Sequence, residues 1–501
     1  MLSTYTLFFL LAGAALLVVQ LAITSSKLAG IPGPWIARFT DLWRFRAQNS
    51  KGWSARLVAL HEKHGKLVRI GPRHVSISDP KAVPIVYGTS PVWLKGPSYY
   101  GAATVSQGRT VPSVIAMTER QHTAVRKSAG RAFTTNSMLD YEASIETSAT
   151  ELVRVLEDHP TTDVANWLQL FAMDVLMRIA FGESLGFMGK GGDVDGILDA
   201  VMARFDHWNA WAALPGADYL FNKGPLASLL RKQGDSPLAR VGLAKLMARK
   251  GAADQTEKKD LLQKFLDGQA KYPDIVSHDE ILGIIMSTIG AGADTTAGTI
   301  AYTLYLLCKH PAAAQKLRAE LDEAQRAGTL TSPPRWSQVS QLPYLDATLK
   351  ESMRVFPIAA WGLDRIVPPG GATIAGQYIP AGTVVGCQID AVHLDEDVYG
   401  QDSSTFRPER WLEASEDQHR RMDRAFLAFS AGKRTCTGLH IAWLEMKKVL
   451  PLLLMNFEMD LVDPGQDVVG SVRISAVKYP PPIWMHVKKR QPIDVPDAPI
   501  P

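Results

Sequence analysis

The chain has 501 residues, 46% of them hydrophobic, which is enough apolar surface for a large buried core. Its 54 basic and 50 acidic residues leave a net charge of +4, which is too small to indicate a nucleic-acid-binding protein. The three cysteines, Cys308, Cys387 and Cys436, form no CxxC pair. The composition therefore argues against a disulfide framework or a zinc site and favours a reducing compartment.

The first segment, Leu2 to Ile23, contains no charged residue. At 1.5 Å per residue it would span roughly 33 Å, so it predicts a single transmembrane helix. A cleaved signal peptide is the alternative, but no basic residue precedes the apolar run, and the run is long. Lys27, Arg38 and Arg44 follow this segment, and the positive-inside rule then places the rest of the chain in the cytosol.

A proline-rich stretch separates this segment from the bulk of the chain. Its centre, Ile31-Pro-Gly-Pro-Trp35, predicts a stiff, non-helical linker. We therefore expect four parts: a transmembrane anchor at residues 2–23, a linker at 24–50, one large domain at 51–490, and a disordered tail at 491–501.

The domain begins with weak strand signals and a loop. The runs Leu67–Ile70 and His74–Ile77 flank Gly71-Pro72 and predict a hairpin. The stretch Val92–Pro112 is rich in glycine, serine and tyrosine and predicts a long loop. Residues 136–266 are mostly amphipathic helix, in which we find no cluster of catalytic residues.

A basic helix is predicted over Thr118–Phe133. His122 and Arg126 are four residues apart, so their side chains share one face of that helix. A solvated charged face is the simpler explanation of these residues, and a shared binding target is the alternative.

A much longer helix is predicted over Ser277–His310. Ser277 and Glu280 have the spacing of a capping box, and the helix would be about 50 Å long. Its middle, Ala291-Gly-Ala-Asp-Thr-Thr296, is rich in small residues, which by themselves most simply indicate close packing. Asp294 followed by Thr295 needs a further reason, because an unpartnered buried carboxylate is unfavourable.

Another helix is predicted over Leu342–Phe356, between two prolines. Within it, Glu351 and Arg354 share a face, a pattern that is common by chance. The later segment Phe406-Arg-Pro-Glu-Arg-Trp411 makes the pattern more specific. Between them, Val367–Val385 predicts a small antiparallel sheet, as does Ser471–Val487 near the end of the chain.

The most informative stretch is Phe429-Ser-Ala-Gly-Lys-Arg-Thr-Cys-Thr-Gly438. Its glycines allow a tight turn around Cys436, and Arg434 adds a fixed cation. A helix is predicted from Leu439 to Leu450, ended or kinked by Pro451. Because a helix N-terminus stabilises a thiolate, this arrangement suits a soft metal ligand. A lone cysteine near glycines is more often an inert buried thiol.

The four motifs together, in this order and spacing, resemble those of the cytochrome P450 family. The resemblance covers nearly the whole chain. It implies a mainly α fold with small antiparallel β-sheets, the cytochrome P450 fold, preceded by one N-terminal transmembrane helix. Thr437 departs from the aliphatic residue that usually follows the cysteine in this family, and its hydroxyl would shift the redox potential by bonding toward the sulfur.

The resemblance also implies a set of site residues. The cofactor would be heme b, whose iron takes Cys436 as its axial thiolate ligand. Asp294 and Thr295 would deliver protons and hold a water or hydroperoxide above the heme, and Gly292 would leave room for dioxygen. Two further groups are implied by position: His122, Arg126, Arg365, Phe429 and Arg434 as heme-binding residues, and Glu351, Arg354 and Arg410 as a structural charge triad.

The implied function is that of a monooxygenase in the endoplasmic reticulum membrane with its catalytic domain in the cytosol. Electrons would come from a separate NADPH-cytochrome P450 reductase, docked on a face that includes Lys127, Lys433 and Lys447. The enzyme would hydroxylate, epoxidise or further oxidise a lipophilic small molecule, in a pocket shaped by the Val92–Pro112 loop, Phe205 and Trp361. The narrower resemblance is to fungal pisatin-demethylase-like members, which favours secondary-metabolite biosynthesis.

Three other functions stay open at this stage. A heme-thiolate isomerase or dehydratase would need no external electrons, and the Asp294–Thr295 pair argues against it. A monooxygenase that detoxifies foreign compounds is the second alternative, and a non-catalytic heme protein that binds or senses a ligand is the third.

Overall fold

The computed structural model describes residues 26–106, 109–111, 113–224, 227, 236–251, 258–359, 362–491 and 493. The predicted anchor at residues 2–23, nearly all of the predicted tail at 491–501, and Trp361 lie outside the described residues.

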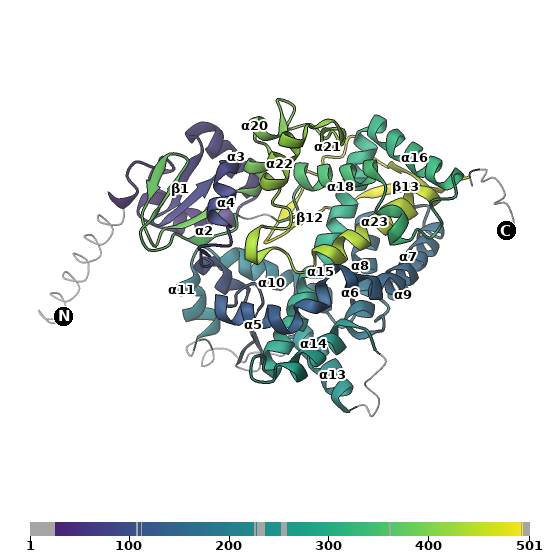
Figure 1. The fold of residues 1–501 in the computed structure, drawn as a ribbon, viewed down its shortest axis with the longest axis horizontal. Helices are drawn as coiled ribbons and strands as arrows, with labels where there is room; N and C mark the ends of the chain where they lie inside the picture. Colours follow the sequence, from purple (N-terminus) through teal and green to yellow (C-terminus); the bar gives the residue numbers. More distant parts are fainter. Residues whose placement is uncertain are drawn as a thin grey trace, which may run out of the picture.

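The described chain is a mainly helical body with small sheets, and its strand-rich end is formed by the N-terminal part together with residues from the C-terminal half (Figure 1). The α-helices are α2 (Leu42–Gln48), α3 (Trp53–His64), α4 (Val83–Val86), α5 (Glu119–Ala129), α6 (Thr135–Met138), α7 (Glu142–Glu157), α8 (Val164–Phe181), α9 (Phe187–Lys190), α10 (Ile197–Trp211), α11 (Pro215–Asp218), α13 (Pro237–Gly251), α14 (Leu261–Lys271), α15 (His278–Lys309), α16 (Pro311–Arg326), α17 (Trp336–Val339), α18 (Pro343–Val355), α19 (Ile389–His393), α20 (Glu396–Tyr399), α21 (Arg410–Glu413), α22 (Glu416–Ala425) and α23 (Leu439–Asn456).

Short 3-10 and π-helical turns connect these helices. The 3-10 turns are η1 (Trp35–Arg38), η2 (Pro80–Ala82), η3 (Pro97–Ala102), η4 (Gly130–Phe133), η5 (Leu139–Tyr141) and η7 (Gly432–Arg434), and η6 (Tyr219–Lys223) is a π-helix.

The strands form one four-stranded sheet and several smaller ones. They are β1 (Leu67–Gly71), β2 (His74–Ile77), β3 (Thr104–Ser106), β4 (Arg109–Val111), β5 (Thr161–Asp163), β6 (Arg365–Ile366), β7 (Ala372–Ile374), β8 (Gln377–Ile379), β9 (Val384–Cys387), β10 (Phe457–Leu461), β11 (Arg473–Ile474), β12 (Lys478–Tyr479) and β13 (Trp484–Lys489).

The largest sheet, in the order β1-β2-β9-β6, corrects the expectation that all sheets are antiparallel. The predicted hairpin β1–β2 is antiparallel, but β9 pairs with β2 in parallel, with His74 opposite Val384. A parallel pair needs a long crossover, and here most of the helical body lies between the two strands. Strand β6, which carries the predicted heme-binding residue Arg365, pairs with β9 on the side away from the hairpin.

Helix α15 passes through the middle of the helical body and packs along α8 (Figure 1). The predicted capping box is present: the Ser277 hydroxyl accepts from the backbone N–H of Glu280, whose carboxylate accepts from the backbone N–H of Ser277. A Cβ at Gly292 would lie 3.0 Å from Leu176 of α8, so this glycine permits close packing of the two helices. The expectation that Gly292 makes room for dioxygen stays a prediction.

In the described part of the chain, α8 is the helix that is both long and apolar enough to cross a membrane, and 78% of its apolar window is buried within the fold. It is a core helix that contacts α15 and α7.

The helix that follows the cysteine loop extends beyond its predicted end. Pro451 lies inside α23, which continues to Asn456. Leu450, Leu452 and Leu453 around the proline are buried, and burial of these side chains outweighs the lost backbone hydrogen bond.

Candidate active site

The cysteine loop is closed by short backbone contacts that leave Cys436 between η7 and α23. The Cys436 N–H donates to the Phe429 carbonyl over 2.9 Å. Gly432 has φ 67°, and a Cβ there would lie 1.8 Å from the Tyr87 carbonyl oxygen, so only glycine fits. The Phe429 ring lies 6.1 Å from that of Trp443 and supports the loop from the side of α23.

Cys436 keeps accessible surface even though its sulfur lies deep within the fold. Burial raises the pKa of the thiol, whereas the N–H groups of Gly438 and Leu439 and the positive charge of Arg126 lower it. These N–H groups at the start of α23 favour a thiolate, which is the form that binds a soft metal.

Arg434, two residues before the cysteine, has a buried donor without an acceptor among the described residues. Its Nε donates to Glu119 over 2.7 Å and its Nη2 to the Met117 carbonyl over 2.8 Å, but Nη1 has no hydrogen-bond partner. A buried donor of this kind indicates that an acceptor outside the polypeptide completes the site.

Arg365 and His122, predicted from distant parts of the sequence, lie near Arg434. Arg365 is buried, and its guanidinium donates to the carbonyls of Leu363 and Asp364 and also bonds to the Tyr99 hydroxyl. Burial, helped by the positive charges of Arg434, Lys95 and Arg126, lowers the pKa of His122 to about 3.

Lys95 is a member of this cluster that sequence analysis missed. Burial lowers its pKa well below the usual value, and Arg434 and Arg365 lower it further, whereas Glu119 alone raises it. Its Nζ donates to the Ile115 carbonyl over 2.8 Å. A backbone bridge to Arg365 brings Lys95 here, and no sequence motif marks that contact.

Within the cluster of Lys95, His122, Arg126, Arg365 and Arg434, the inward-lying Arg365 and Arg434 alone hold more positive charge than Glu119 can neutralise, whereas His122 is uncharged at neutral pH and Arg126 is exposed. Like charges that repel one another in a buried site need anionic partners. The two propionates of heme b supply such anions, and the sulfur of Cys436 is a suitable axial ligand for its iron. The residues present therefore fit this cofactor.

On α15, the side chains of Asp294 and Thr295, which were predicted to act together, form hydrogen bonds with different partners. Asp294 is buried and accepts from Gln169 Nε2 over 2.8 Å and from the Tyr479 hydroxyl over 3.0 Å. The Thr295 hydroxyl donates instead to the Ala291 carbonyl over 2.7 Å. Burial raises the pKa of Asp294, and the two hydrogen bonds lower it in part. Neither Gln169 nor Tyr479 was expected from the sequence.

One face of α15 remains accessible in the middle of this buried helix. Ala291 is exposed and Thr288 and Thr295 are half-buried, whereas Ile289 and Asp294 are buried. The three accessible residues have helical spacing, so they lie on one face, and Thr295 belongs to it.

The Tyr479–Asp294 contact leads to a prediction about pH. Hydrogen bonds to a carboxylate favour its charged form, so Tyr479→Phe raises the pKa of Asp294 further. In the variant, the folded protein therefore binds more protons than the unfolded protein up to a higher pH. The free energy of unfolding then falls as the pH rises from the unfolded-state pKa of Asp294 to its raised folded-state pKa. We expect the substitution to lower the free energy of unfolding by about 1.5–3 kcal/mol at neutral pH and by less near pH 4.5. Denaturant unfolding at both pH values measures this.

Tyr302→Phe is the matched control, because the Tyr302 hydroxyl is buried without a hydrogen-bond partner among the described residues. It should change stability little, and equally, at both pH values. The same pH-independent loss in the two variants would show that Tyr479 does not act on the Asp294 carboxylate.

Glu351, Arg354 and Arg410 contact one another as the sequence motifs suggest. Glu351 accepts from Arg354 Nη2 over 2.7 Å and Nε over 2.9 Å, and from Arg410 Nε over 3.3 Å. Trp411 Nε1 also donates to Glu351 over 2.9 Å, and Arg410 Nη1 pairs with Asp402 over 2.6 Å. The group is therefore a larger buried network than the predicted triad.

The prediction that Lys447 belongs to the docking face is wrong. Its side chain is 8% exposed and pairs with Asp346 over 2.8 Å. It is thus neutralised inside the protein, because α23 turns this residue toward α18. Lys433 and Lys127 are exposed, as are Arg126 and Arg131.

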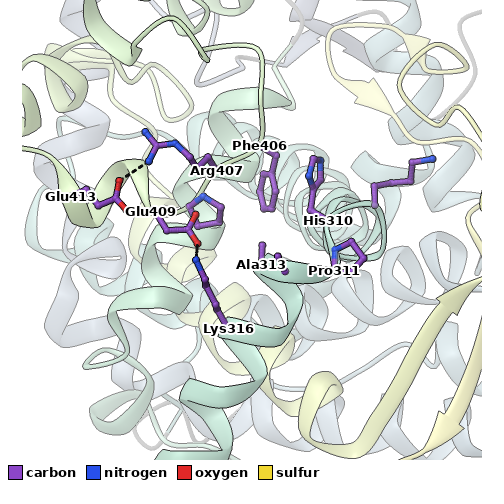
Figure 2. A pocket seen from close by; sticks show the side chains of 11 residues that line it. His310, Pro311, Ala313, Lys316, Phe406, Arg407, Glu409 and Glu413 are labelled. Atoms are coloured by element: carbon purple, nitrogen blue, oxygen red, sulfur yellow. Dashed lines mark hydrogen bonds and ion pairs between the residues drawn. The ribbon is translucent and has the colours of Figure 1, made fainter.

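A pocket of about 500 Å³ lies where α15 ends and α16 begins, and none of the predicted site residues lines it (Figure 2). Figure 2 shows that its charges are paired across the wall, Lys316 with Glu409 and Arg407 with Glu413, each over 2.6 Å. The remaining charged side chain, Lys309, donates to the Pro464 carbonyl over 2.7 Å, so the pocket has no cluster of unpaired charges that would require a ligand.

An accessible cysteine ahead of a helix, a buried cluster of cations and a long helix with an accessible threonine define a site of the heme-thiolate class. A model of the family described as cytochrome P450 matches residues 32–483. The chain belongs to the cytochrome P450 family, and its class is that of the cytochrome P450 monooxygenases.

The chain is similar along most of its length to fungal enzymes. A cytochrome P450 monooxygenase of Aspergillus terreus is 35% identical over 457 residues, which is 89% of this chain and 93% of that protein. Cytochrome P450 monooxygenase pkfB of Emericella nidulans is 34% identical, with 90% of each chain covered. Cytochrome P450 monooxygenase mpaDE of Penicillium brevicompactum is 32% identical, and the match covers 53% of that longer protein.

Proposed function

We propose that this protein is a membrane-bound heme-thiolate monooxygenase that uses dioxygen and electrons from a separate NADPH-cytochrome P450 reductase to oxidise a lipophilic small molecule. The observation that carries this proposal is the convergence of Lys95, His122, Arg365 and Arg434 near the Cys436 loop. The relatives are named as fungal monooxygenases, which supports a role in secondary-metabolite biosynthesis.

Each residue group of the site has a defined task. Cys436 would hold the iron, and the cation cluster would bind the propionates. When bound, heme supplies the chemistry of dioxygen activation, with electron density from the thiolate favouring O–O cleavage. The chain itself supplies protons and excludes water from the site.

Thr295 is the residue best placed to hold a proton donor next to the reacting oxygen, because it lies on the accessible face of α15. Asp294 would be the proton reserve. Its two oxygens accept from Gln169 and Tyr479, and each oxygen keeps a further lone-pair site through which a proton would pass toward Thr295.

Two exposed apolar segments support attachment to a membrane. Trp35, Phe39 and Leu42 follow the predicted anchor, and Tyr219 and Phe221 lie in η6. Helix α2 packs on α10, and α2 and α11 lie at the same end of the described chain (Figure 1). A face of this kind would rest on the cytosolic surface of the endoplasmic reticulum, with the domain 51–490 oriented by the linker at 24–50.

The exposed basic residues beside the cysteine loop would bind the reductase. We expect Lys433→Glu to raise the reductase concentration needed for half-maximal turnover about tenfold at low ionic strength, because charge complementarity steers association. The difference should shrink in about 0.5 M salt. Lys488→Glu, on exposed β13, is the matched control. Equal effects of the two substitutions would contradict docking at this face.

The proposal is tested with the full chain in lipid vesicles together with reductase, NADPH and ¹⁸O₂. A monooxygenase places one labelled oxygen atom in the product and consumes NADPH. An isomerase or dehydratase would act without NADPH or reductase. A ligand-sensing heme protein would bind compounds without oxygen consumption, and either result would refute the proposal. A detoxifying monooxygenase would label many unrelated compounds rather than a few.

A further inference from the structure

Arg204 of α10 is a half-buried cation inside the fold that none of the described carboxylates neutralises. Its Nε and Nη2 donate to the Ala102 carbonyl, its Nη2 also to Ser113 Oγ over 2.8 Å, and its Nη1 to the Met286 carbonyl over 3.2 Å. All of these acceptors are neutral. Burial alone lowers the pKa of Arg204, to about 10, so the guanidinium remains charged at neutral pH.

Most of the buried arginines among the described residues have acidic partners, although the buried Arg69 donates to the carbonyls of Gly71, Arg38 and Pro72. Arg249 pairs with Asp260 over 2.6 Å, and Arg354 with Glu351 over 2.7 Å. Arg365, by contrast, donates to carbonyls, and the proposed function assigns it a carboxylate of the heme. Arg204 has the same pattern as Arg365 at a different place in the fold.

The surroundings of Arg204 connect it to the accessible face of α15. A Cβ at Gly290 would lie 2.8 Å from Arg204 Nη1, so the guanidinium contacts α15 at this glycine. Gly290 directly precedes Ala291, the exposed residue of that face. Thr295 is five residues beyond Gly290, about 7–8 Å further along the helix axis. Arg204 therefore borders the region in which the proposed function places the substrate.

A second cation nearby is already neutralised. The charge of Arg204 lowers the pKa of Lys223, but Lys223 pairs with Asp218 over 2.9 Å and donates to the Tyr100 and Gly101 carbonyls. The pair contributes no net charge, so the positive charge of Arg204 is left without an anion.

We infer that Arg204 binds a carboxylate of the substrate, and that the substrates are lipophilic molecules that carry one such anionic group. The guanidinium has five N–H groups, and the hydrogen bonds above use four of them, which leaves one on Nη1. One charge-assisted hydrogen bond suits a singly charged oxygen group. This inference rests on the proposed function, because it concerns the substrate of the same site.

The test compares acids with neutral partners of the same shape. The probes are 2-naphthoate with methyl 2-naphthoate, and dodecanoate with dodecan-1-ol, added to the heme-loaded full chain. Binding is followed by the thermal unfolding midpoint and by the heme absorption band. We expect the wild type to bind at least one acid about tenfold more tightly than its neutral partner, because hydrogen bonds to charged groups are the stronger ones.

Two variants separate charge from structural support. Arg204→Gln should remove the preference for the acid and leave binding of the neutral partner unchanged, and Arg204→Lys should restore part of the preference. Ser113→Ala is the matched control: it removes a neutral acceptor of Arg204 but keeps the cation, so the preference should remain. The inference would be overturned if the wild type showed no preference for any acid, or no binding at all. It would also be overturned if Arg204→Gln weakened binding of the acid and of its neutral partner equally.

Failure of the proposed function gives a different result. If reductase and NADPH produce no oxygen consumption while the acid preference depends on Arg204, the monooxygenase proposal fails and the carboxylate site stands. If turnover occurs and Arg204→Gln alters no acid preference, the inference fails alone.

Discussion

Cys436→Ser should abolish the strongly red-shifted absorption band of the reduced, carbon-monoxide-bound protein that a thiolate-ligated heme produces, together with all reductase-driven turnover. The physical reason is that a serine hydroxyl, unlike a thiolate, stays protonated at neutral pH and is a poor ligand for iron. The loop itself should remain folded, because its closing contacts are backbone ones, between Cys436 N–H and Phe429 and between Gly432 and Tyr87.

Cys308→Ser is the control for this experiment. Cys308 lies near the end of α15, where its sulfur contacts the Met459 carbonyl at 3.4 Å. The red-shifted band should persist in that variant. A properly folded wild type that lacks the band would show that Cys436 is not the working ligand, and the oxygen chemistry assigned to this site would have to be abandoned.

Glu351→Ala should be the most destabilising single substitution in the buried network of Glu351, Arg354 and Arg410. The side chains of Arg354 and Arg410 are 0% and 3% exposed, so removal of their shared carboxylate leaves buried positive charge. Arg410 keeps Asp402, but Arg354 would keep only the carbonyls of His393, Ser403 and Thr405. Breaking such a buried pair costs about 3–5 kcal/mol, a large part of the stability of a typical protein.

Denaturant unfolding, followed by circular dichroism, together with the yield of soluble protein measures this loss. Glu413→Gln is the matched control, because Glu413 pairs with Arg407 in the same region but is 65% exposed. An exposed pair contributes less than about 1 kcal/mol. Similar unfolding midpoints for the two variants would show that the Glu351 network does not hold this part of the fold together.

Local features of this chain could be predicted because they depend on neighbours in sequence. The capping box of Ser277 and Glu280 and the prolines that bound α18 act within one helical turn, so the helix limits followed from the residues. The cysteine loop was recognisable because a tight turn requires glycine at fixed positions. At Gly432 no other residue fits, because its Cβ would collide with the Tyr87 carbonyl oxygen.

Features that depend on long-range packing could not be predicted. Pro451 lies within α23 because burial of the surrounding leucines outweighs a local preference, and Lys447 is paired inside the protein because α23 faces α18 there. The parallel pairing of β2 with β9 joins segments on either side of the helical body.

The same division applies to the site. The sequence by itself determined the family, marked Cys436 as the proposed ligand and placed Asp294 and Thr295 on the long helix. Only the tertiary structure decided that Asp294 bonds to Gln169 and Tyr479, that Lys95 joins the cation cluster, and that Arg204 has no acid partner among the described residues. These groups lie far apart in the sequence, and no local pattern sets which charges meet, because burial and packing bring them together.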